Sequence, residues 1–285
     1  TFRPDKSITR GAFAGILDRF LHFQNASPAD TFSDTAGTYW EDAILKLHAS
    51  GIYLGNQGAA LPSSTITRQQ AVAMIGRAFR IAPETAAPDY TDTDQIAEYA
   101  LAYVGEFEAR GYLTDSAAGT FRPADPITRA ELINILSNMV DTLVKETTTV
   151  TENVSGSLLI SAADGATLKG IKIGGDLILA PGVTKDVTLV DCVIQGIIRN
   201  YGTGEVRFLY GDYNYENIED TDCLPAVAQY LVQHLLGYYN ITRTFYSVPR
   251  HNGRTVTEKT RQVFVRRHHE DTPFDPQPTR KQKLF

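Results

Sequence analysis

In the first half of the chain, apolar residues recur three and four positions apart, which is the spacing of one face of a helix. Two of these segments are followed by a glycine, Gly51 or Gly111, as is common where a helix ends. The others follow the tripeptide Ile-Thr-Arg. The pattern predicts helices whose buried faces contain Trp40, Ala43, Ile44 and Leu47; Ala100, Val104 and Phe107; Phe13, Ile16, Leu17 and Phe20; Ala71, Met74, Ile75 and Phe79; and Leu132, Ile135, Leu136 and Met139.

From residue 157 the pattern changes to short apolar runs with a two-residue alternation, which is the period of a β-strand. Glycines such as Gly174, Gly182 and Gly196 separate the runs. Short, evenly spaced strands with glycine turns predict a parallel β-solenoid or a small sandwich, with room for about two or three coils. The runs are 157–161, 167–174, 176–180, 186–190, 196–200 and 205–209.

One phrase occurs in three versions, and an arginine stands at the same place in each. The versions are FRPDKSITRGAFAGIL at 2–17, LPSSTITRQQAVAMI at 61–75 and FRPADPITRAELINIL at 121–136, and the arginines are Arg10, Arg68 and Arg129. Internal repetition of this kind predicts equivalent structural units. The two later versions follow a predicted helix, whereas the first version opens the chain.

The threonine before each arginine is a good residue to cap the start of a helix. Thr128 with Glu131, and Thr67 with Gln70, match the capping box, in which each side chain bonds the backbone N–H of the other residue. In the first phrase Thr9 has Ala12 as the third residue, so the box is broken there. The sequence therefore predicts helices that begin at the three arginines.

The recurring arginine falls in the first helical turn, where the helix dipole disfavours a cation. Neighbouring positions vary among the phrases while the arginine stays, which favours a shared role over a chance surface charge. Helix N-termini present free N–H groups that attract anions, and a guanidinium beside them can bind a planar carboxylate or a phosphate. The local pattern therefore predicts an anionic ligand.

The combined pattern resembles the S-layer homology domain over roughly residues 1–142. The residues that carry the resemblance are Phe32, Asp34, Trp40, Ala43, Ile44, Gly51, Phe121, Pro123, Ile127, Thr128, Arg129, Ala130 and Glu131. Domains of this family usually occur in threes, fold into a pseudo-threefold helical spindle and tether proteins to bacterial cell walls. Their ligand is a peptidoglycan-linked secondary cell-wall polysaccharide, which often carries a pyruvate ketal.

The resemblance also implies a ligand site. The family's arginine is taken to bind the pyruvyl carboxylate, the threonine before it to orient the helix start, and an aromatic residue to line the groove. Carried over by position, the ligand-binding candidates are Arg129, Arg68, Arg10, Thr128, Thr67, Thr9, Trp40 and Glu131. The motif around Arg129 is the most complete of the three, and the motif around Arg10 is the least complete.

We therefore expect a mixed fold: an α-helical spindle of S-layer homology repeats, a small β-solenoid-like (parallel β-helix) region and an irregular C-terminal tail. The expected segments are 1–28, a partial first repeat; 29–86 and 87–142, the second and third repeats; 143–156, a linker; 157–209, the solenoid-like segment; and 210–285, a helix or hairpin with a basic tail. The chain reads as a fragment that begins inside a repeat, so we expect that the threefold arrangement does not close.

Composition is that of a globular protein, with 42% hydrophobic and 21% charged residues, and no apolar run is long enough to span a membrane. The net charge of −6 is uneven, because 240–285 is basic and the rest is acidic. Such asymmetry is typical of an interaction tail, but the acidic body argues against nucleic acid as a partner. Within the tail, 224–240 predicts a helix, 243–267 predicts a hairpin around Asn252-Gly253, and the last residues predict disorder.

The sequence contains no phosphate-binding glycine loop, HExxH motif or nucleophile elbow, so no catalytic residue is assigned. Cys192 and Cys223 are too few for a disulfide framework or a four-cysteine zinc site, and the His268–His269 pair has no further ligands. We expect neither a metal nor a cofactor. The prediction is a non-catalytic anchoring protein, extracellular at the bacterial cell wall.

The alternative is a wall-anchored carbohydrate-active enzyme whose chemistry lies in the solenoid. Some β-helices are polysaccharide lyases, which need clustered carboxylates for calcium and a basic catalytic residue. Acidic residues in this segment are scattered, as Asp176, Asp186 and Asp191 illustrate. A cluster of two or three acids with a Lys or Arg on one solenoid face would favour the enzyme.

Overall fold

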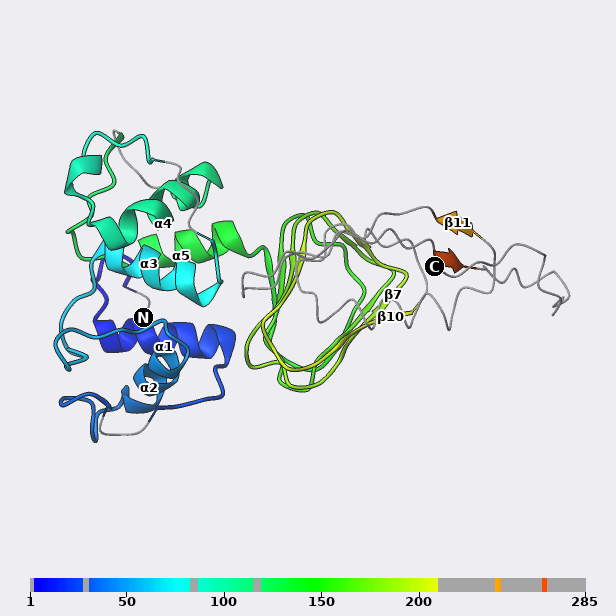
Figure 1. Ribbon diagram of the computed structural model, residues 1–285, viewed down its shortest axis with the longest axis horizontal. Coiled ribbons are helices and arrows are strands. Elements are labelled where there is room, and N and C mark those ends of the chain that lie inside the picture. The colour runs from blue at the N-terminus through cyan, green and yellow to red at the C-terminus, as the bar shows by residue number, and fades with distance from the viewer. Residues whose placement is uncertain are drawn as a thin grey trace, which may run out of the picture.

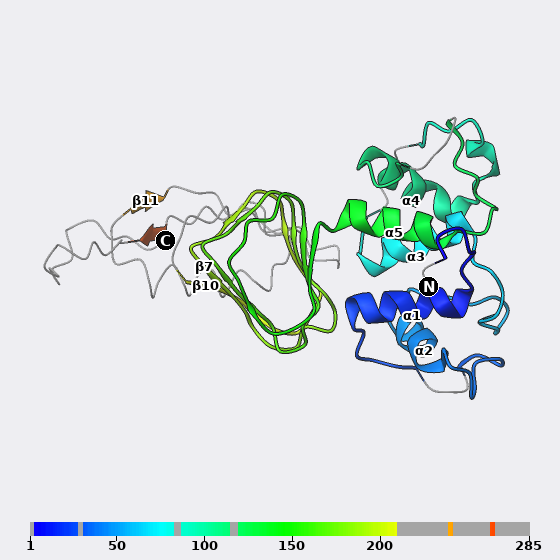
Figure 2. The same ribbon diagram turned by 180° about the vertical axis from the view of Figure 1, so that it is seen from behind.

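The computed structural model describes residues 3–27, 31–82, 87–114, 119–209, 239–241 and 263–265. A helical region is followed by a parallel β-solenoid, and the two lie side by side (Figures 1 and 2). One continuous cluster of buried apolar side chains includes residues of both regions. The predicted combination of helices and a β-solenoid is confirmed.

Three helices begin at the recurring arginines: α1 (Arg10–Leu21), α3 (Arg68–Ala78) and α5 (Arg129–Met139). The other two are α2 (Glu41–Ala49) and α4 (Glu98–Ala109), which Trp40 and Ala97 precede as N-cap residues. A short 3₁₀ helix, η2, spans Thr93–Gln95. Gly51 and Gly111 follow α2 and α4 with φ of +72° and +71°, a conformation that favours glycine, as the sequence predicted.

The extended segments before α1, α3 and α5 meet at the centre of the helical region. There Ile8 N–H donates to Ile127 O (3.1 Å), Ile127 N–H to Ile66 O (3.0 Å), and Ile66 N–H to Ile8 O (3.0 Å). The three bonds form a closed ring in which each phrase holds an equivalent position. All three isoleucines are buried.

The expectation that the threefold arrangement would not close is therefore wrong. Closure needs only the extended segments that carry Ile8, Ile66 and Ile127, and the first phrase supplies its segment without an upstream helix. Backbone bonds between neighbouring phrases satisfy the polar groups at the centre, so the ring is complete within the residues present.

The solenoid is built from three parallel sheets, and its cross-section is triangular (Figure 1). One sheet contains β1 (Thr142–Val144), β3 (Leu158–Ile160), β6 (Leu177–Leu179) and β9 (Ile198–Asn200). The second contains β2 (Thr149–Val150), β4 (Thr167–Lys169), β7 (Val187–Val190) and β10 (Val206–Leu209). The third pairs β5 (Lys172–Ile173) with β8 (Val193–Ile194).

The solenoid starts earlier and has more coils than the sequence predicted. Residues 143–156, expected as a linker, contain most of β1 and all of β2, which pair in parallel with β3 and β4. The solenoid therefore begins at Thr142 and has about four coils. The first coil is rich in threonine and glutamate, so it lacks the apolar runs of the later coils; its pairing with the next coil holds it in place.

The regular spacing of glycines in this segment has a steric cause. A Cβ at Gly196 would overlap the backbone of Gly175 one coil earlier, and a Cβ at Gly204 would overlap the carbonyl of Lys185. At these corners successive coils stack backbone on backbone, which leaves no room for a side chain.

The helical region contacts the side of the solenoid through polar and apolar groups. The Tyr201 hydroxyl donates to Phe79 O (2.6 Å), and His22 Nδ1 lies 2.7 Å from Ser161 O. Leu159 and Ile178, which are paired neighbours on β3 and β6, are buried, and Ile178 lies with Phe79 at this boundary. The wall of the solenoid thus continues the core of the helical region.

The C-terminal predictions fall largely outside the described residues. Strands β11 (Tyr239–Ile241) and β12 (Val263–Val265) pair antiparallel, with Asn240 opposite Phe264. The predicted helix 224–240 is wrong at its last two residues, which belong to β11, and its remainder lies outside the described residues. The turn predicted at Asn252-Gly253 also lies outside them.

Within the described ranges, no helix combines the length and apolar character needed to cross a membrane.

Candidate functional site: a cationic cavity between α1 and α5

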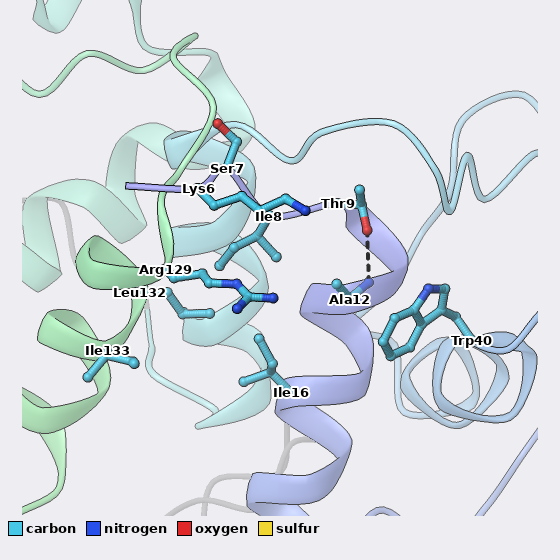
Figure 3. A pocket seen from close by; sticks show the side chains of 10 residues that line it. All are labelled: Lys6, Ser7, Ile8, Thr9, Ala12, Ile16, Trp40, Arg129, Leu132 and Ile133. Carbon is cyan, nitrogen blue, oxygen red and sulfur yellow. Dashed lines mark hydrogen bonds between the residues drawn. The ribbon is translucent and has the colours of Figure 1, made fainter. Parts of the chain in front are cut away.

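A cavity of about 500 Å³ opens between α1 and α5 (Figure 3). The extended segment before α1 lines its upper edge with Lys6, and Arg129 enters it from the first turn of α5. Trp40 borders it from the start of α2. The full lining consists of Lys6, Ser7, Ile8, Thr9, Ala12, Ile16, Trp40, Arg129, Leu132 and Ile133.

The cavity contains two cations and no acid. Arg129 is half-buried and Lys6 is exposed, and no residue lining the cavity is Asp or Glu. Among the described residues, neither the Arg129 guanidinium nor the Lys6 ammonium forms a hydrogen bond or ion pair. Their charges therefore remain available to an anion that enters from solvent.

Trp40 reaches the cavity because α1 carries small residues where the indole lies. A Cβ at Gly11 or Gly15 would overlap the Trp40 ring, so the ring packs directly on the backbone of α1. Tyr39 packs edge-on against the same ring, with centroids 4.6 Å apart. The indole is thus fixed against α1 and forms an apolar border of the cavity, with α1 between it and Arg129 (Figure 3).

Arg68 has a different environment from that of Arg129. Its side chain is 1% exposed, and Nη1 lies 3.1 Å from Glu131 Oε1. Nε donates to Phe121 O (2.8 Å), and the guanidinium lies 5.2 Å from the centroid of the Phe121 ring. Arg68 is therefore enclosed and neutralised by groups of the protein itself.

Glu131 serves two arginines and the helix start together. Its Oε1 also lies 2.6 Å from Arg122 Nη2, and its Oε2 accepts the Thr128 N–H (2.7 Å). Burial raises the pKa of the Glu131 carboxyl, whereas the Thr128 N–H, Arg122 and Arg68 lower it. Their combined effect exceeds that of burial, so the net pKa falls below the usual 4.5. Glu131 is ionised at neutral pH and occupied within the fold.

Arg10 is intermediate between the other two arginines. It is half-buried, its Nε donates to Ala60 O (2.9 Å), and its guanidinium lies 4.8 Å from the centroid of the Tyr53 ring. Nη1 reaches Gln70 Oε1 at 3.4 Å, a weak contact with a neutral acceptor. Arg10 thus has internal hydrogen bonds but no carboxylate partner among those contacts.

The three threonines cap their helices as the sequence predicted. Each side chain accepts the N–H of the third following residue, and the capping boxes of Thr67 with Gln70 and Thr128 with Glu131 are both complete. At Thr9 only one of the two bonds of the box is present, in which Thr9 Oγ1 accepts the Ala12 N–H.

The expectation of free N–H groups at these helix starts is wrong. In α5 the N–H of Arg129 donates to Lys6 O, the N–H of Ala130 to Pro4 O and that of Glu131 to Thr128 Oγ1. The starts of α1 and α3 are closed in the same way by the neighbouring phrase. An anion at this site would therefore bind side chains rather than the helix terminus.

Of the eight candidates, the cavity brings together Arg129, Thr9 and Trp40. The other five, Arg68, Arg10, Thr128, Thr67 and Glu131, do not line it. Repeat comparison missed Lys6, because the equivalent residues in the other phrases are Ser64 and Asp125. Lys6 was visible in the sequence as a lysine three residues before the cap threonine. A search for residues that recur in all three phrases could not find it, because it occurs in only one.

Two acids of the solenoid, Asp176 and Asp186, hold successive coils together. Asp176 accepts the Ile197 N–H (2.9 Å) and lies 3.1 Å from Arg199 Nε. Asp186 accepts the Glu205 N–H (3.0 Å) and also pairs with Arg207. In the ranges that the structure describes, no group of three or more His, Cys, Asp or Glu residues is placed to hold a metal ion.

A helical ring built on one recurring phrase, joined to a parallel solenoid, defines a modular protein with one helical and one solenoid module. Residues 89–133 match the S-layer homology domain, so the chain carries a domain of that family. This domain is a non-catalytic anchoring module, and it assigns the protein to the bacterial cell surface or cell wall.

Three relatives illustrate the similarity. The chain is 25% identical over 146 residues to an amylopullulanase of Thermoanaerobacterium thermosulfurigenes (49% of this chain, 8% of the relative). It is 25% identical over 155 residues to cell surface glycoprotein 1 of Acetivibrio thermocellus (50% and 7%). It is 24% identical over 144 residues to the surface-layer 125 kDa protein of Lysinibacillus sphaericus (49% and 12%). The matched segment spans only a small part of each relative.

Proposed function

We propose that the helical region anchors the protein to the bacterial cell wall by binding an anionic secondary cell-wall polysaccharide in the Arg129 cavity. The observation that carries this proposal is the pair Lys6 and Arg129, two cations without an internal acidic partner, in a cavity that the indole of Trp40 also lines. A site with convergent cations and an aromatic wall suits a sugar that bears an acid group.

The chemistry of the two cations favours a carboxylate on the polymer. A guanidinium donates two parallel hydrogen bonds to a planar carboxylate, and the ammonium of Lys6 adds an adjustable point charge. The face of Trp40 and the apolar side chains of Ile16 and Leu132 offer contact to the sugar ring. A pyruvate ketal, which joins a carboxylate rigidly to a hexose, fits these requirements.

This proposal is tested by sedimentation of the protein with purified bacterial cell walls. Binding should be strong to walls that retain their secondary polysaccharide and weak to walls from which hydrofluoric acid has removed it. Arg129→Gln should lose most of the binding, because the remaining charge of Lys6 lacks the bidentate geometry. Added salt should weaken the wild-type binding, since exposed charges are screened.

Lys169→Gln is the matched control, because Lys169 is an exposed cation on the solenoid that does not line the cavity. It removes the same charge and should bind walls as the wild type does. Equal binding to stripped and intact walls would contradict the proposal, as would undiminished binding by Arg129→Gln.

A further inference from the structure

The three arginines of the recurring phrase share one backbone geometry. Each arginine N–H donates to the carbonyl of the residue that stands three before the next cap threonine. The bonds are Arg129 to Lys6 O (3.1 Å), Arg10 to Ser64 O (2.8 Å) and Arg68 to Asp125 O (2.9 Å). Every arginine therefore lies beside the neighbouring phrase, and the side chains of that phrase decide what the guanidinium meets.

The side chain that each arginine meets stands three residues after the neighbouring threonine. Arg68 meets Glu131 there, at 3.1 Å, and Arg10 meets Gln70, at 3.4 Å. By the same relation Arg129 faces Ala12, and both line the cavity (Figure 3). A methyl group accepts no hydrogen bond, so the guanidinium of Arg129 has no acceptor at this position.

A second position follows the same order. The residue three before each threonine is Lys6 at the Arg129 site, Ser64 at the Arg10 site and Asp125 at the Arg68 site. Going from Arg129 to Arg10 to Arg68, the residue at this position thus changes from cationic to neutral to acidic. An external anion would meet a second cation, Lys6, at the Arg129 site, whereas at the Arg68 site the carboxylates of Glu131 and Asp125 already lie against the arginines of the protein itself.

We propose that Ala12 determines which of the three arginines binds ligand, so that one chain binds one acid group, at Arg129. This inference rests on the proposed function and specifies the site and its stoichiometry. The carboxylate of Glu131 occupies at Arg68 the place that a ligand carboxylate takes at Arg129. Arg68 is accordingly a structural residue of the ring, although it shares its motif with Arg129.

The test is a calorimetric titration of the full chain with a monosaccharide that bears a 4,6-linked pyruvate ketal. The wild type should bind one molecule per chain. Ala12→Glu supplies the missing carboxylate from within and should weaken binding about tenfold to a hundredfold, as expected when a charged hydrogen bond must be displaced. Ala12→Gln should weaken it less, because the amide is a weaker acceptor.

Two controls separate this inference from instability and from the proposed function. Ala49→Glu adds the same charge at an exposed position near the end of α2 and should bind as the wild type does. Ala12→Glu completes the capping box with Thr9, so its melting temperature should not fall. If Ala12→Glu nevertheless unfolds, the smaller loss expected of Ala12→Gln decides the question.

The possible failures can be told apart. A wild type that binds neither the ketal sugar nor intact walls contradicts the proposed function itself. A wild type that binds two or three sugars, or whose binding persists unchanged in Ala12→Glu and Ala12→Gln, leaves wall anchoring in place but overturns the role of Ala12.

Discussion

The guanidinium of Arg68 and the carboxylate of Glu131 form an enclosed ion pair that links the starts of α3 and α5, with Nη1 and Oε1 3.1 Å apart. The pair joins two phrases of the ring, and the 1% exposure of Arg68 excludes water from the cation. Removing one partner from such a pair leaves a charge without compensation, which costs more than the net value of the pair.

Glu131→Gln should therefore lower the free energy of unfolding by about 3 kcal/mol, the lower end of the range for breaking a buried pair. The glutamine still completes the capping box with Thr128, as Gln70 does with Thr67, so the loss reports the charge alone. Denaturant unfolding measures the difference. Glu98→Gln, at an exposed position in the first turn of α4, is the matched control and should change stability little.

The same carboxylate makes the helical region sensitive to acid. Because the folded pKa of Glu131 lies below the usual 4.5, the unfolded chain binds this proton more readily. Its contribution to stability is complete above that value and is lost as the pH falls through the folded pKa. Melting temperatures measured between about pH 3 and pH 7 should fall more steeply on the acid side for the wild type than for Glu131→Gln. Parallel curves for the two proteins would refute this account of the acid sensitivity.

Leu61 adopts a backbone conformation that favours glycine, with φ of +56°. Its N–H donates to Asp34 Oδ2 (2.8 Å), which holds the loop before α3 in this shape. Leu61→Gly should raise the free energy of unfolding by about 1 kcal/mol, because relief of the strain exceeds the entropy that glycine loses. Leu61→Ala keeps the Cβ and should give no gain. A gain of equal size for both variants would show that the side chain, not the backbone, is responsible.

At Gly204 the stacking of the solenoid coils predicts that adding a side chain lowers the stability. A Cβ there would overlap the carbonyl of Lys185, so Gly204→Ala should destabilise the protein by about 1–3 kcal/mol. Gly170→Asn provides the comparison. Gly170 has φ of +66° with open space around it, and Asp191 takes φ of +52° at the equivalent corner one coil later. Thermal unfolding should distinguish the two; a harmless Gly204→Ala would contradict the stacking described here.

Local features of the fold were predictable from the sequence, because they depend on residues a few positions apart. The cap threonines fix where α1, α3 and α5 begin, and Gly51 and Gly111 mark where α2 and α4 end. The later coils were visible as apolar runs between glycines. The first coil was not, because β2 consists of Thr149 and Val150 among polar residues and depends on pairing with β4.

The candidate site was harder to predict, because its composition depends on how the phrases are arranged in space. Repetition identified three arginines as equivalents and could not tell that Glu131 meets Arg68 while Ala12 meets Arg129. The broken capping box at Ala12 looked like a defect of the first phrase. In the ring, the same substitution leaves Arg129 without an internal acceptor.

The single tryptophan of the sequence, Trp40, lines the cavity and allows the most direct test of wall-polymer binding at Arg129. We predict that titration with the 4,6-pyruvate ketal sugar changes the Trp40 fluorescence in a saturable manner. The change should be lost in Arg129→Gln, retained in Lys169→Gln, and absent when the sugar's carboxylate is a methyl ester. A fluorescence change that is the same for the acid and its ester, or that persists in Arg129→Gln, would contradict binding of the carboxylate by Arg129.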